Sequence, residues 1–306
     1  MKLNSIDLFC GCGGLSEGMH QAGFKTKVAV EIEEKAVLAY KLNHKRTIVI
    51  QKDIRKVDID KVKKHFKGEP VHLLAGCPPC QGFSSVRRLN RPQSIEDDRN
   101  DLVLEYLRFV KELKPLTIMM ENVPALQHYD KFKYVVDELR KLGYNPKVRI
   151  VNVKDYEVPQ SRKRLVMVGS ILGNLEIANP INKKVTVRDM IGNIESTETT
   201  HDLVHKIYPK HTEKVMRRIK LTPKNGGSRK DLPEEYTLPC HKKENVGFND
   251  IYGRLRWDDY STTITGGCLN PSKGRFLHPE EDRCITAREA ALLQSFPIKY
   301  RFPTNI

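Results

Sequence analysis

Two cysteines in the stretch GCPPCQGFS, residues 76–84, have a spacing that is compatible with several kinds of chemistry. Cys77 and Cys80 are separated by Pro78 and Pro79. Such a pair could be a redox couple, half of a zinc site, or a nucleophile accompanied by a second, uninvolved thiol. Which of these applies decides the function of the chain.

The redox and zinc alternatives fit the surroundings of these cysteines less well than the nucleophile does. A redox Cys-x-x-Cys motif normally follows the first strand of a small thioredoxin-like unit, whereas Cys77 and Cys80 follow the fourth apolar run of the chain. Zinc bound by four thiolates would also require Cys10 and Cys12. Cys10 lies in a turn that we expect to bend around a ligand, and the two prolines hinder the wrapping of both sulfurs around one ion. Zinc and an inert pair stay open as alternatives.

A cysteine nucleophile would find partners elsewhere in the predicted fold. A free cysteine is only a few per cent thiolate at neutral pH, so a positive field must lower its pKa. The basic loop VRRLNRPQ, residues 86–93, follows directly. A later strand ends near Glu121, and another stretch carries Arg162 and Arg164, whose spacing of two places them on one face. The pattern therefore favours a nucleophile with an acid and cations around it.

Alternating apolar and amphipathic stretches predict the elements that must position these side chains. Short apolar runs predict strands at 5–9, 27–31, 47–50, 71–76, 116–122 and 164–170, and helical spacing occurs at 13–23, 33–44, 59–66, 100–114 and 133–143. This order favours an α/β fold with a parallel, doubly wound sheet. Ligands of such sheets lie at the carboxyl ends of the strands.

The first three strand ends carry residues suited to a nucleoside. The first strand runs into DLFCGCGGLSEG, residues 7–18, where glycines let the backbone turn sharply and approach a ligand at a helix N-terminus. The second ends at Glu31, about 20 residues downstream, where an acidic side chain takes ribose hydroxyls in such folds. Asp53 and Ile54 follow the third strand and suit the polar edge and the face of an adenine. Together these positions predict a nucleoside pocket.

Size, composition and charge limit the class of protein. The 306 residues, 39% of them hydrophobic, suffice for one large domain or two modest ones. There is no apolar run long enough to span a membrane and no signal peptide, so we expect a cytoplasmic protein whose seven cysteines are free, catalytic or metal-bound rather than disulfide-bonded. A net charge of +15, with most of the excess in the first half, indicates a polyanionic partner.

The composition changes after residue 170, which predicts a second, smaller lobe. Residues 171–282 are polar, irregular and rich in proline and glycine, and the helical stretch TAREAALLQSF, residues 286–296, follows them. We therefore predict a first domain at 1–170, a lobe at 171–282, and a helix within 283–306 that returns to the first domain.

Five short blocks, in this order, resemble the conserved blocks of one enzyme family. They are DLFCGCGG, GCPPCQGFS, ENV, QSRKR and TAREAALLQSFP, and together they cover almost the whole chain. On these motifs the chain is similar to the bacterial type of DNA (cytosine-5)-methyltransferase. The resemblance implies a Rossmann-like, mostly parallel domain that binds S-adenosyl-L-methionine, and a smaller target-recognition lobe. It further implies methyl transfer to carbon 5 of cytosine in a specific sequence of duplex DNA.

The resemblance also implies roles for residues of the catalytic blocks. The cysteine of the Pro-Cys-Gln block corresponds to Cys80, the acid of Glu-Asn-Val to Glu121, and the last arginine of Gln-x-Arg-x-Arg to Arg164. Arg162 is the other arginine of that block. Cys80 would add to carbon 6 of the ring, while the acid and the arginine bind its polar edge. Because a stacked base is inaccessible, it must flip out of the duplex, and the loop from Ser84 to Asp98 is expected to close over it.

The implied cofactor residues come from the same blocks and their neighbours. They are Phe9, Gly11, Cys12, Gly14, Glu31, Ile32, Asp53, Ile54, Pro79 and Leu102. Two positions depart from the family pattern. Ile32 stands where some members have an aromatic residue, and Cys77 stands where glycine is usual. If Cys77 simply stands in place of that glycine, the Cys-x-x-Cys spacing arises by chance.

The lobe is the least informative part of the sequence. A basic stretch with a Gly-Gly turn at 217–230 is expected either to enter a DNA groove or to be a solvated loop. YSTTIT, residues 260–265, resembles the threonine-containing segment near the end of the family's recognition lobes. No metal site is predicted, because the paired spacing of a zinc site is absent from Cys240, His241, Cys268 and His278.

Two rival functions stay open. A transfer-RNA methyltransferase of the same fold is one, although the Cys-Phe-Thr signature of that branch is absent from the second lobe. A catalytically impaired DNA-binding fragment is the other, although neither Cys80 nor Glu121 is needed merely to bind. We expect a monomer that acts in a restriction-modification system beside a cognate endonuclease, or an orphan methylase. In a prokaryote it would associate with the nucleoid through its DNA.

The sequence after LLQSFP leads to one more expectation. Family members normally continue into a block with Gly-Asn and Val-Pro-Pro that contacts the cofactor, whereas this sequence ends at Ile306. We therefore expect the 306-residue chain to bind the cofactor weakly and to need a complementing C-terminal fragment for full activity.

Overall fold

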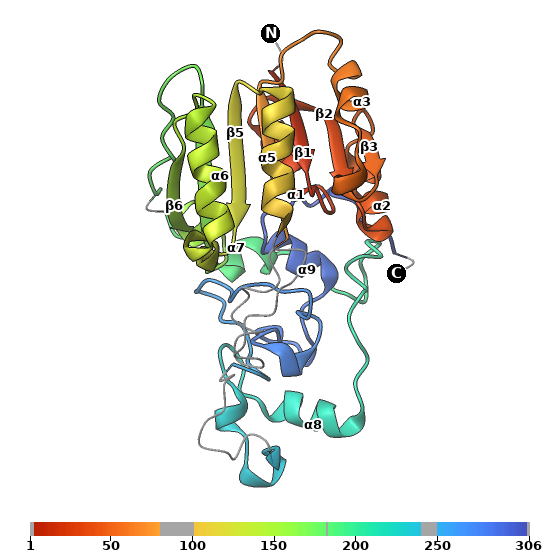
Figure 1. Cartoon of the computed structure of the whole chain (residues 1–306). Coiled ribbons are helices and arrows are strands. Elements are labelled where there is room, and N and C mark those ends of the chain that lie inside the picture. Colours follow the sequence, from red (N-terminus) through yellow and green to blue (C-terminus); the bar gives the residue numbers. More distant parts are fainter. Residues whose placement is uncertain (1–2, 80–100, 182, 240–249, 305–306) are drawn as a thin grey trace.

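One seven-stranded sheet organises the first part of the chain (Figure 1). The computed structural model describes residues 3–79, 101–181, 183–239 and 250–304. The strand order is β3-β2-β1-β4-β5-β7-β6. The strands are β1 (Leu3–Leu8), β2 (Phe24–Glu31), β3 (Ile48–Gln51), β4 (Leu73–Gly76), β5 (Thr117–Asn122), β6 (Lys147–Asn152) and β7 (Lys163–Ser170).

Strand direction determines which strand ends meet. β1 pairs in parallel with β2 and β4, β2 with β3, and β4 with β5. β7 runs antiparallel to both β5 and β6. The carboxyl ends of β1 to β5 and the amino end of β7 therefore share one edge of the sheet. The chain order reverses between β1 and β4, which is where open α/β sheets bind their ligands.

The apolar patterns of the sequence do not predict β6, and its position explains why. β6 is an edge strand that pairs with β7. Its residues alternate between half-buried and exposed, and even Val148 and Ile150 are 40% and 39% exposed. An edge strand of this kind lacks the continuous apolar run of the central strands.

Helices cover both faces of the sheet, so the α/β fold is doubly wound as predicted. They are α1 (Gly14–Gln21), α2 (Glu34–Asn43), α3 (Ile59–Lys64), α5 (Leu102–Leu113) and α6 (Asp130–Lys141). α5 contacts α3 and α6, and all three pack on the main apolar core. On the other face, Tyr40 of α2 is buried against Ala29 and Cys10. Ala29 lies between two core residues of β2, so its side chain points away from that core.

A second buried core lies in the lobe that follows the sheet domain (Figure 1). The lobe contains α7 (Val187–Ile191) and α8 (Glu213–Leu221), and α9 (Ala287–Leu292) lies between it and the sheet. Ala290 and Leu292 of α9 share this core with Leu255 and Phe276 of the lobe. The residues after α9 continue to the sheet domain. The exact domain boundaries stay a prediction.

The basic stretch predicted as a loop is partly helical. α8 covers its first residues, with Ile219 fully buried. The Gly-Gly turn packs inside the lobe, because a Cβ on Gly226 would lie 2.6 Å from Arg256 Nε and one on Gly227 would lie 2.3 Å from the carbonyl oxygen of Pro223. Residues 217–221 are therefore helical rather than a loop, and the two glycines have a packing role. Entry of this stretch into a DNA groove stays a prediction.

Arg254 ties the segments of the lobe together. Its side chain is fully buried, and its guanidinium donates to five acceptors, which uses all its N–H groups. The acceptors are the carbonyl oxygens of Ile219, Thr222, His278 and Glu281 and the carboxylate of Asp282. The carboxylate of Asp282 is 34% exposed, so the bonds to the carbonyl oxygens are the more buried part of this network. Because the lobe has little regular secondary structure, its fold depends on this one side chain.

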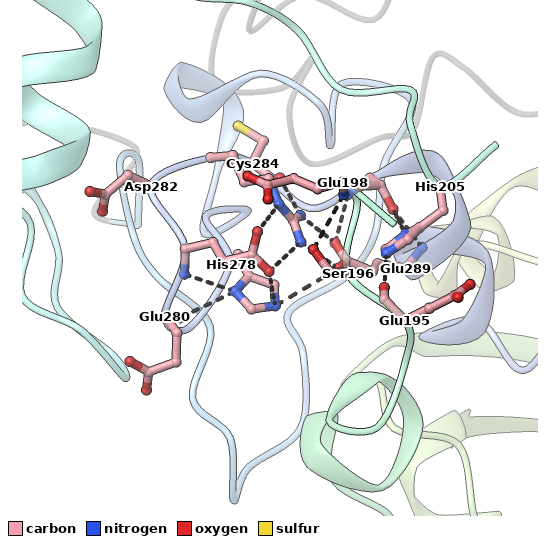
Figure 2. Close-up of polar contacts among 12 residues, drawn as sticks. Glu195, Ser196, Glu198, His205, His278, Glu280, Asp282, Cys284 and Glu289 are labelled. Atoms are coloured by element: carbon pink, nitrogen blue, oxygen red, sulfur yellow. Dashed lines mark hydrogen bonds and ion pairs between the residues drawn. The ribbon is translucent and has the colours of Figure 1, made fainter. Parts of the chain in front are cut away.

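Arg283 and Glu289 form a buried ion pair. Figure 2 shows His278 beside Glu289. The Arg283 Nη1 and Nη2 atoms lie 2.7 and 2.8 Å from the two carboxylate oxygens of Glu289, which is fully buried. His278 Nδ1 accepts the backbone N–H groups of Glu280 and Glu281 at 3.2 and 3.0 Å. Burial lowers the pKa of His278, so the ring is neutral. It is an acceptor in this cluster and carries no charge at neutral pH.

Neither a metal site nor a membrane-spanning helix is found in the part of the chain that the structure describes. Within it, no group of three or more His, Cys, Asp or Glu side chains is arranged to hold a metal ion. None of its helices combines the length and the apolar character needed to cross a membrane. Cys240 and His241, discussed above, lie outside the described residues.

Asp7 on β1 is a fully buried carboxyl group. Its Oδ2 atom accepts the Ser16 hydroxyl at 2.6 Å, and that hydroxyl also lies 2.6 Å from the Tyr40 hydroxyl. The Oδ1 atom has no hydrogen-bond partner among the described residues. Burial raises the pKa of Asp7 to about 7, against the opposing effect of the Ser16 hydrogen bond, and Glu31 raises it further. The folded protein therefore favours the protonated form.

We predict that the free energy of unfolding falls as the pH rises from 4 to 8 because Asp7 ionises. The pKa in the unfolded chain is near 3.8, so the full stability is present below that pH and is lost as the pH passes through about 7. The loss is on the order of 4 kcal/mol. Urea unfolding of the wild type and of Asp7→Asn at several pH values measures it. The Asn variant should lack this slope, and parallel curves would contradict the assignment.

Candidate active site

The predicted site residues that the structure describes meet along one edge of the sheet. The glycine turn (residues 9–14) follows β1, Glu31 ends β2, and Asp53 follows β3. Residues 77–79 follow β4 and Glu121 lies near the end of β5. Arg164 is the second residue of β7. It reaches the same edge because β7 runs in the opposite direction.

The glycine turn uses backbone conformations that favour glycine. Gly11 and Gly13 have φ angles of 53° and 98°, and Phe9 has 60°, an uncommon value for a side chain with a Cβ. The N–H of Gly13 donates to the carbonyl oxygen of Cys10 at 2.9 Å. A Cβ on Gly11 would meet no atom within 4 Å, so the turn borders open space there. α1 begins at Gly14, directly after the turn.

Glu31 ties the end of β2 to the glycine turn. Its Oε2 atom accepts the N–H of Gly11 at 2.9 Å, and its Oε1 atom accepts those of Ile32 and Glu33 at 2.8 and 2.9 Å. The sequence analysis assigned Glu31 to a ribose, and the structure adds this second, structural task. Ile32 beside it is 62% exposed, an unusual position for an isoleucine. It presents an open apolar surface at the edge of the sheet.

Asp53, Ile54 and Leu102 are largely engaged by the protein itself. The carboxylate of Asp53 caps a short 3-10 turn and lies 2.8 Å from Arg55 Nη2, and these hydrogen bonds lower the pKa of Asp53. Ile54 and Leu102 are 4% and 8% exposed and belong to the main core. They can shape the wall of a pocket but offer a ligand little surface. Asp53 would have to exchange or share its arginine partner to bind a base.

These features fit a nucleoside cofactor at the edge of the sheet. Open space at Gly11 leaves room for a ligand close to the backbone. Glu31 supplies a carboxylate for hydroxyl groups, and Ile32 supplies an apolar surface for a base. Gly11, Glu31 and Ile32 therefore lie where the sequence predicts a nucleoside pocket, whereas Asp53 is paired with Arg55 and Ile54 belongs to the core. The pocket itself stays a prediction.

The segment that leads to Cys80 is anchored by a residue without a predicted role. The buried Asn122 donates from Nδ2 to the carbonyl oxygen of Pro78 at 2.8 Å, and its Oδ1 atom accepts the N–H of Val123 at 2.8 Å. Pro79 is half-buried and directly follows. Cys80 and the loop from Ser84 to Asp98 lie outside the described residues. Asn122 thus joins β5 to the β4 segment that carries the predicted nucleophile.

Glu121 and Arg164 form an ion pair at the edge of the sheet. Arg164 Nε lies 2.8 Å from Glu121 Oε1, and the two side chains are 16% and 28% exposed. Arg162 donates from Nη1 to the carbonyl oxygen of Ile264 at 3.1 Å. Burial lowers the pKa of Arg162, followed by repulsion from Arg164, and the charge of Glu121 opposes both. The structure therefore brings the three predicted polar residues together next to the segment that leads to Cys80.

Cys77 lies against Glu121 on the neighbouring strand. The parallel register ends at Gly76 and Met120, the residues directly before these two. Burial raises the pKa of the Cys77 thiol well above its usual range, and the charge of Glu121 adds to this. A thiol of this kind stays protonated at neutral pH and is a poor nucleophile. The environment of Cys77 therefore favours the other cysteine of the pair as the reactive one.

The lobe contacts the catalytic edge through the YSTTIT segment. The buried Gln160 accepts the N–H of Ile264 at 2.9 Å through its Oε1 atom, and Thr263 donates from its hydroxyl to the carbonyl oxygen of Ser161 at 2.9 Å. Ser261 also donates to the carbonyl oxygen of Pro159 at 2.9 Å. Gln160 and Ile264 both lie in stretches that the sequence analysis quotes, QSRKR and YSTTIT. They are about a hundred positions apart, so the sequence does not reveal their contact.

The residues after α9 contact the glycine turn. The hydroxyl of Tyr300 donates to the carbonyl oxygen of Cys12 at 2.6 Å and lies 3.1 Å from His44 Nε2. A Cβ on Gly14 would lie 3.1 Å from the ring of Phe296. Burial raises the pKa of the Cys12 thiol, so Cys12 offers its backbone rather than a thiolate. Nothing in the sequence marks Tyr300 or His44 as part of the site.

Comparison with known proteins identifies the family of this chain. The family model for C-5 cytosine-specific DNA methylase matches residues 3–306. The chain is 36% identical to the type II methylase M.HgiDII of Herpetosiphon aurantiacus, covering 97% of this chain and 85% of that protein. It is 33% identical to the type II methyltransferase M1.HphI of Haemophilus parahaemolyticus, covering 99% and 80%.

Solved structures show the same fold. A crystal structure described as a prophage-encoded DNA modification methyltransferase (E. coli) superposes with a TM-score of 0.71 at 26% identity and covers 98% of this chain and 90% of that one. The Dnmt2 methyltransferase of S. pombe superposes with a TM-score of 0.67 at 18% identity, covering 99% and 89%. The family model matches nearly the whole sequence, including the glycine turn and the Glu-Asn-Val strand end. The chain therefore belongs to the C-5 cytosine-specific DNA methylases.

Proposed function

We propose that this DNA cytosine methyltransferase binds S-adenosyl-L-methionine at the glycine turn and uses Cys80, Glu121, Arg162 and Arg164 on a flipped cytosine. The observation that carries the proposal is the Glu121–Arg164 ion pair beside the segment that Asn122 anchors. When bound, the cofactor supplies an electrophilic methyl group. Phe9, Gly11, Cys12, Gly14, Glu31, Ile32, Asp53, Ile54, Pro79 and Leu102 would form its pocket.

Cys80 makes carbon 5 of cytosine reactive in this proposal. That carbon is a poor nucleophile, so the Cys80 thiolate first adds to carbon 6, and a carbon–sulfur bond forms as the 5,6 double bond opens. Carbon 5 would then take the methyl group that the bound cofactor supplies, and the demethylated cofactor would be the leaving group. Loss of the proton from carbon 5 and departure of the thiolate restore the double bond. The neighbouring Cys77, protonated and half-buried, takes no part in these steps.

Glu121 and Arg164 bind the polar edge of the base. Glu121 shares a proton with ring nitrogen 3 and so stabilises the charge that develops on the ring, while Arg164 donates to the ring carbonyl. Their ion pair holds each side chain in place before the base arrives. Arg162 keeps a hydrogen bond to the carbonyl of Ile264 and adds positive charge nearby.

The lobe after residue 170 selects the DNA sequence in this proposal. Flipping the base costs a few kcal/mol, which contacts to the base and to the gap in the duplex offset. The net charge of +15 favours binding to the phosphate backbone of double-stranded DNA. We further propose that a monomer acts in the prokaryotic cytoplasm, at the nucleoid, as the methylase of a restriction-modification system with its endonuclease or as an orphan enzyme.

The substrate is tested with S-adenosylmethionine that carries a labelled methyl group. We expect label to enter duplex DNA and not transfer RNA, because the chain resembles type II DNA methylases over almost its full length. Bisulfite sequencing of DNA from cells that express the protein then reveals the recognition sequence. Incorporation of label into RNA alone would overturn the DNA assignment.

The nucleophile is tested with DNA that contains 5-fluorocytosine at the target position. Fluorine cannot leave as a proton, so the covalent adduct should accumulate and map to Cys80. Cys80→Ser should abolish methyl transfer and keep cofactor binding. Cys77→Ser is the matched control and should retain substantial activity, because its thiol stays protonated beside Glu121. An adduct at Cys77 would show that the two cysteines are assigned in the wrong order.

Asn122→Ala is expected to lower kcat about ten-fold or more. The Kd for S-adenosylmethionine should rise by a smaller factor, because Pro79 of the freed segment belongs to the proposed cofactor pocket. The variant leaves the carbonyl of Pro78 without its buried donor, which costs roughly 1–3 kcal/mol and frees the segment that leads to Cys80. Asn122→Asp keeps an acceptor for Val123 but has no N–H for Pro78, so it should share the defect. Asn145→Ala, an exposed asparagine before β6, is the control. A normal kcat for Asn122→Ala would refute this anchoring role.

A further inference from the structure

The C-terminal segment (residues 295–304) makes a contact that the proposed reaction does not use. Tyr300 is 3% exposed, and its hydroxyl donates to the carbonyl oxygen of Cys12 at 2.6 Å. The hydroxyl oxygen can accept a second hydrogen bond, and His44 Nε2 lies 3.1 Å from it. Burial lowers the pKa of His44, so its ring is neutral and can donate from Nε2. The phenol therefore has a partner on each side.

Tyr300 and His44 also fill the space over the glycine turn. A Cβ on Gly13 would lie 2.5 Å from the Tyr300 hydroxyl and 2.8 Å from His44 Nε2. Real Cβ atoms essentially never make contacts this short, and the φ of 98° also disfavours a side chain, so the turn favours glycine at this position. The absence of a side chain on Gly13 is thus what lets the phenol approach the backbone.

The contact fixes the orientation of one peptide group. The peptide between Cys12 and Gly13 has its C=O bound to Tyr300 and its N–H bound to the carbonyl of Cys10 at 2.9 Å. Gly13, on one side of this peptide, has a positive φ angle, and a glycine allows a peptide plane to rotate more freely than other residues do. Without the phenol, only the N–H bond would hold this plane in the part of the chain that the structure describes.

The segment that carries Tyr300 is itself held from two sides. The side chain of Asn43 on α2 donates to the carbonyl of Arg301 and accepts its N–H, both at 2.8 Å. Arg288 on α9 donates from Nη1 to the carbonyl of Tyr300 at 2.8 Å. The rings of Phe296 and Tyr300 are 4.8 Å apart. The hydroxyl is therefore presented to the turn at a fixed place.

We infer that Tyr300 is a positioning residue for the cofactor: its hydroxyl holds the glycine turn in the conformation that receives the donor. The inference rests on the proposed cofactor site at that turn. Tyr300 acts through the Cys12 carbonyl, and no contact of Tyr300 with the cofactor is required. The expected result of losing the hydroxyl is weaker cofactor binding with little change in the chemical step.

The chain contains a matched control for a phenol that bonds to a carbonyl. Tyr144 is 5% exposed, and its hydroxyl donates to the carbonyl oxygen of Pro115 at 2.5 Å, before the amino end of β5. Tyr144→Phe and Tyr300→Phe therefore remove the same kind of hydrogen bond from similarly buried rings. They should lower the melting temperature by similar amounts, while their effects at the glycine turn should differ.

Two measurements on the full chain separate positioning from stability. Hydrogen exchange without ligand should become faster for residues 10–14 in Tyr300→Phe and stay unchanged in Tyr144→Phe. Calorimetric titration should give a Kd for S-adenosylmethionine that is roughly three- to ten-fold higher in Tyr300→Phe, the range for one lost neutral hydrogen bond. In the methyl-transfer assay, KM for the donor should rise while kcat at saturating donor stays near the wild-type value.

The outcomes distinguish this inference from the proposed cofactor site. Ile32→Ala removes an exposed side chain from the proposed pocket and should weaken binding whatever Tyr300 does. If Ile32→Ala binds like the wild type, or the wild type does not bind, the cofactor site itself is wrong. If Ile32→Ala binds more weakly while Tyr300→Phe matches Tyr144→Phe in exchange and in Kd, the site stands and the positioning role of Tyr300 is refuted.

Discussion

The reversed direction of β7 is the constraint on which the catalytic edge depends. In a fully parallel sheet the residues that begin a strand lie at the opposite edge from those that end its neighbours. The antiparallel register, which pairs Asn122 with Leu165, instead brings the start of β7 to the carboxyl end of β5. Arg164 thereby reaches Glu121, and the loop before β7 reaches the lobe through Gln160. One strand reversal thus unites the base-binding pair with the lobe.

The two parts of the molecule are stabilised in different ways. The sheet domain buries a continuous apolar core, with Asp7 as a buried carboxyl group in β1. The lobe has short helices and small apolar clusters, and buried arginines replace regular secondary structure as the connection between its segments. Arg254 and the Arg283–Glu289 pair each satisfy several acceptors from distant positions. Such networks hold irregular loops in fixed positions.

The cofactor end shows how closely the segments of the fold interlock. The glycine turn is bound by Glu31 from β2 on one side and by Tyr300 from the C-terminal segment on the other. The same C-terminal segment is held by Arg288 of α9, which also bonds to Asp202 at the start of the lobe. The turn, α9 and the lobe are therefore parts of one connected set of hydrogen bonds. A cofactor bound at the turn would contact a backbone whose shape depends on residues from all three.

The sequence by itself determined the α/β class, the central strands, the positions of Glu31, Asp53 and Glu121 near the carboxyl ends of strands, and the family, because apolar periodicity and short motifs are local properties. The place of Arg164 at the same edge follows from the reversed direction of β7, which only the tertiary structure decided. The sequence did not predict β6, because an edge strand has no continuous apolar run. It did not predict α8 either, because only one narrow side of this helix is buried. Tertiary structure alone decided the roles of Asn122, Gln160 and Tyr300. Their partners are 44, 104 and 288 positions away, and hydrogen bonds between such distant residues leave no periodic pattern in the chain.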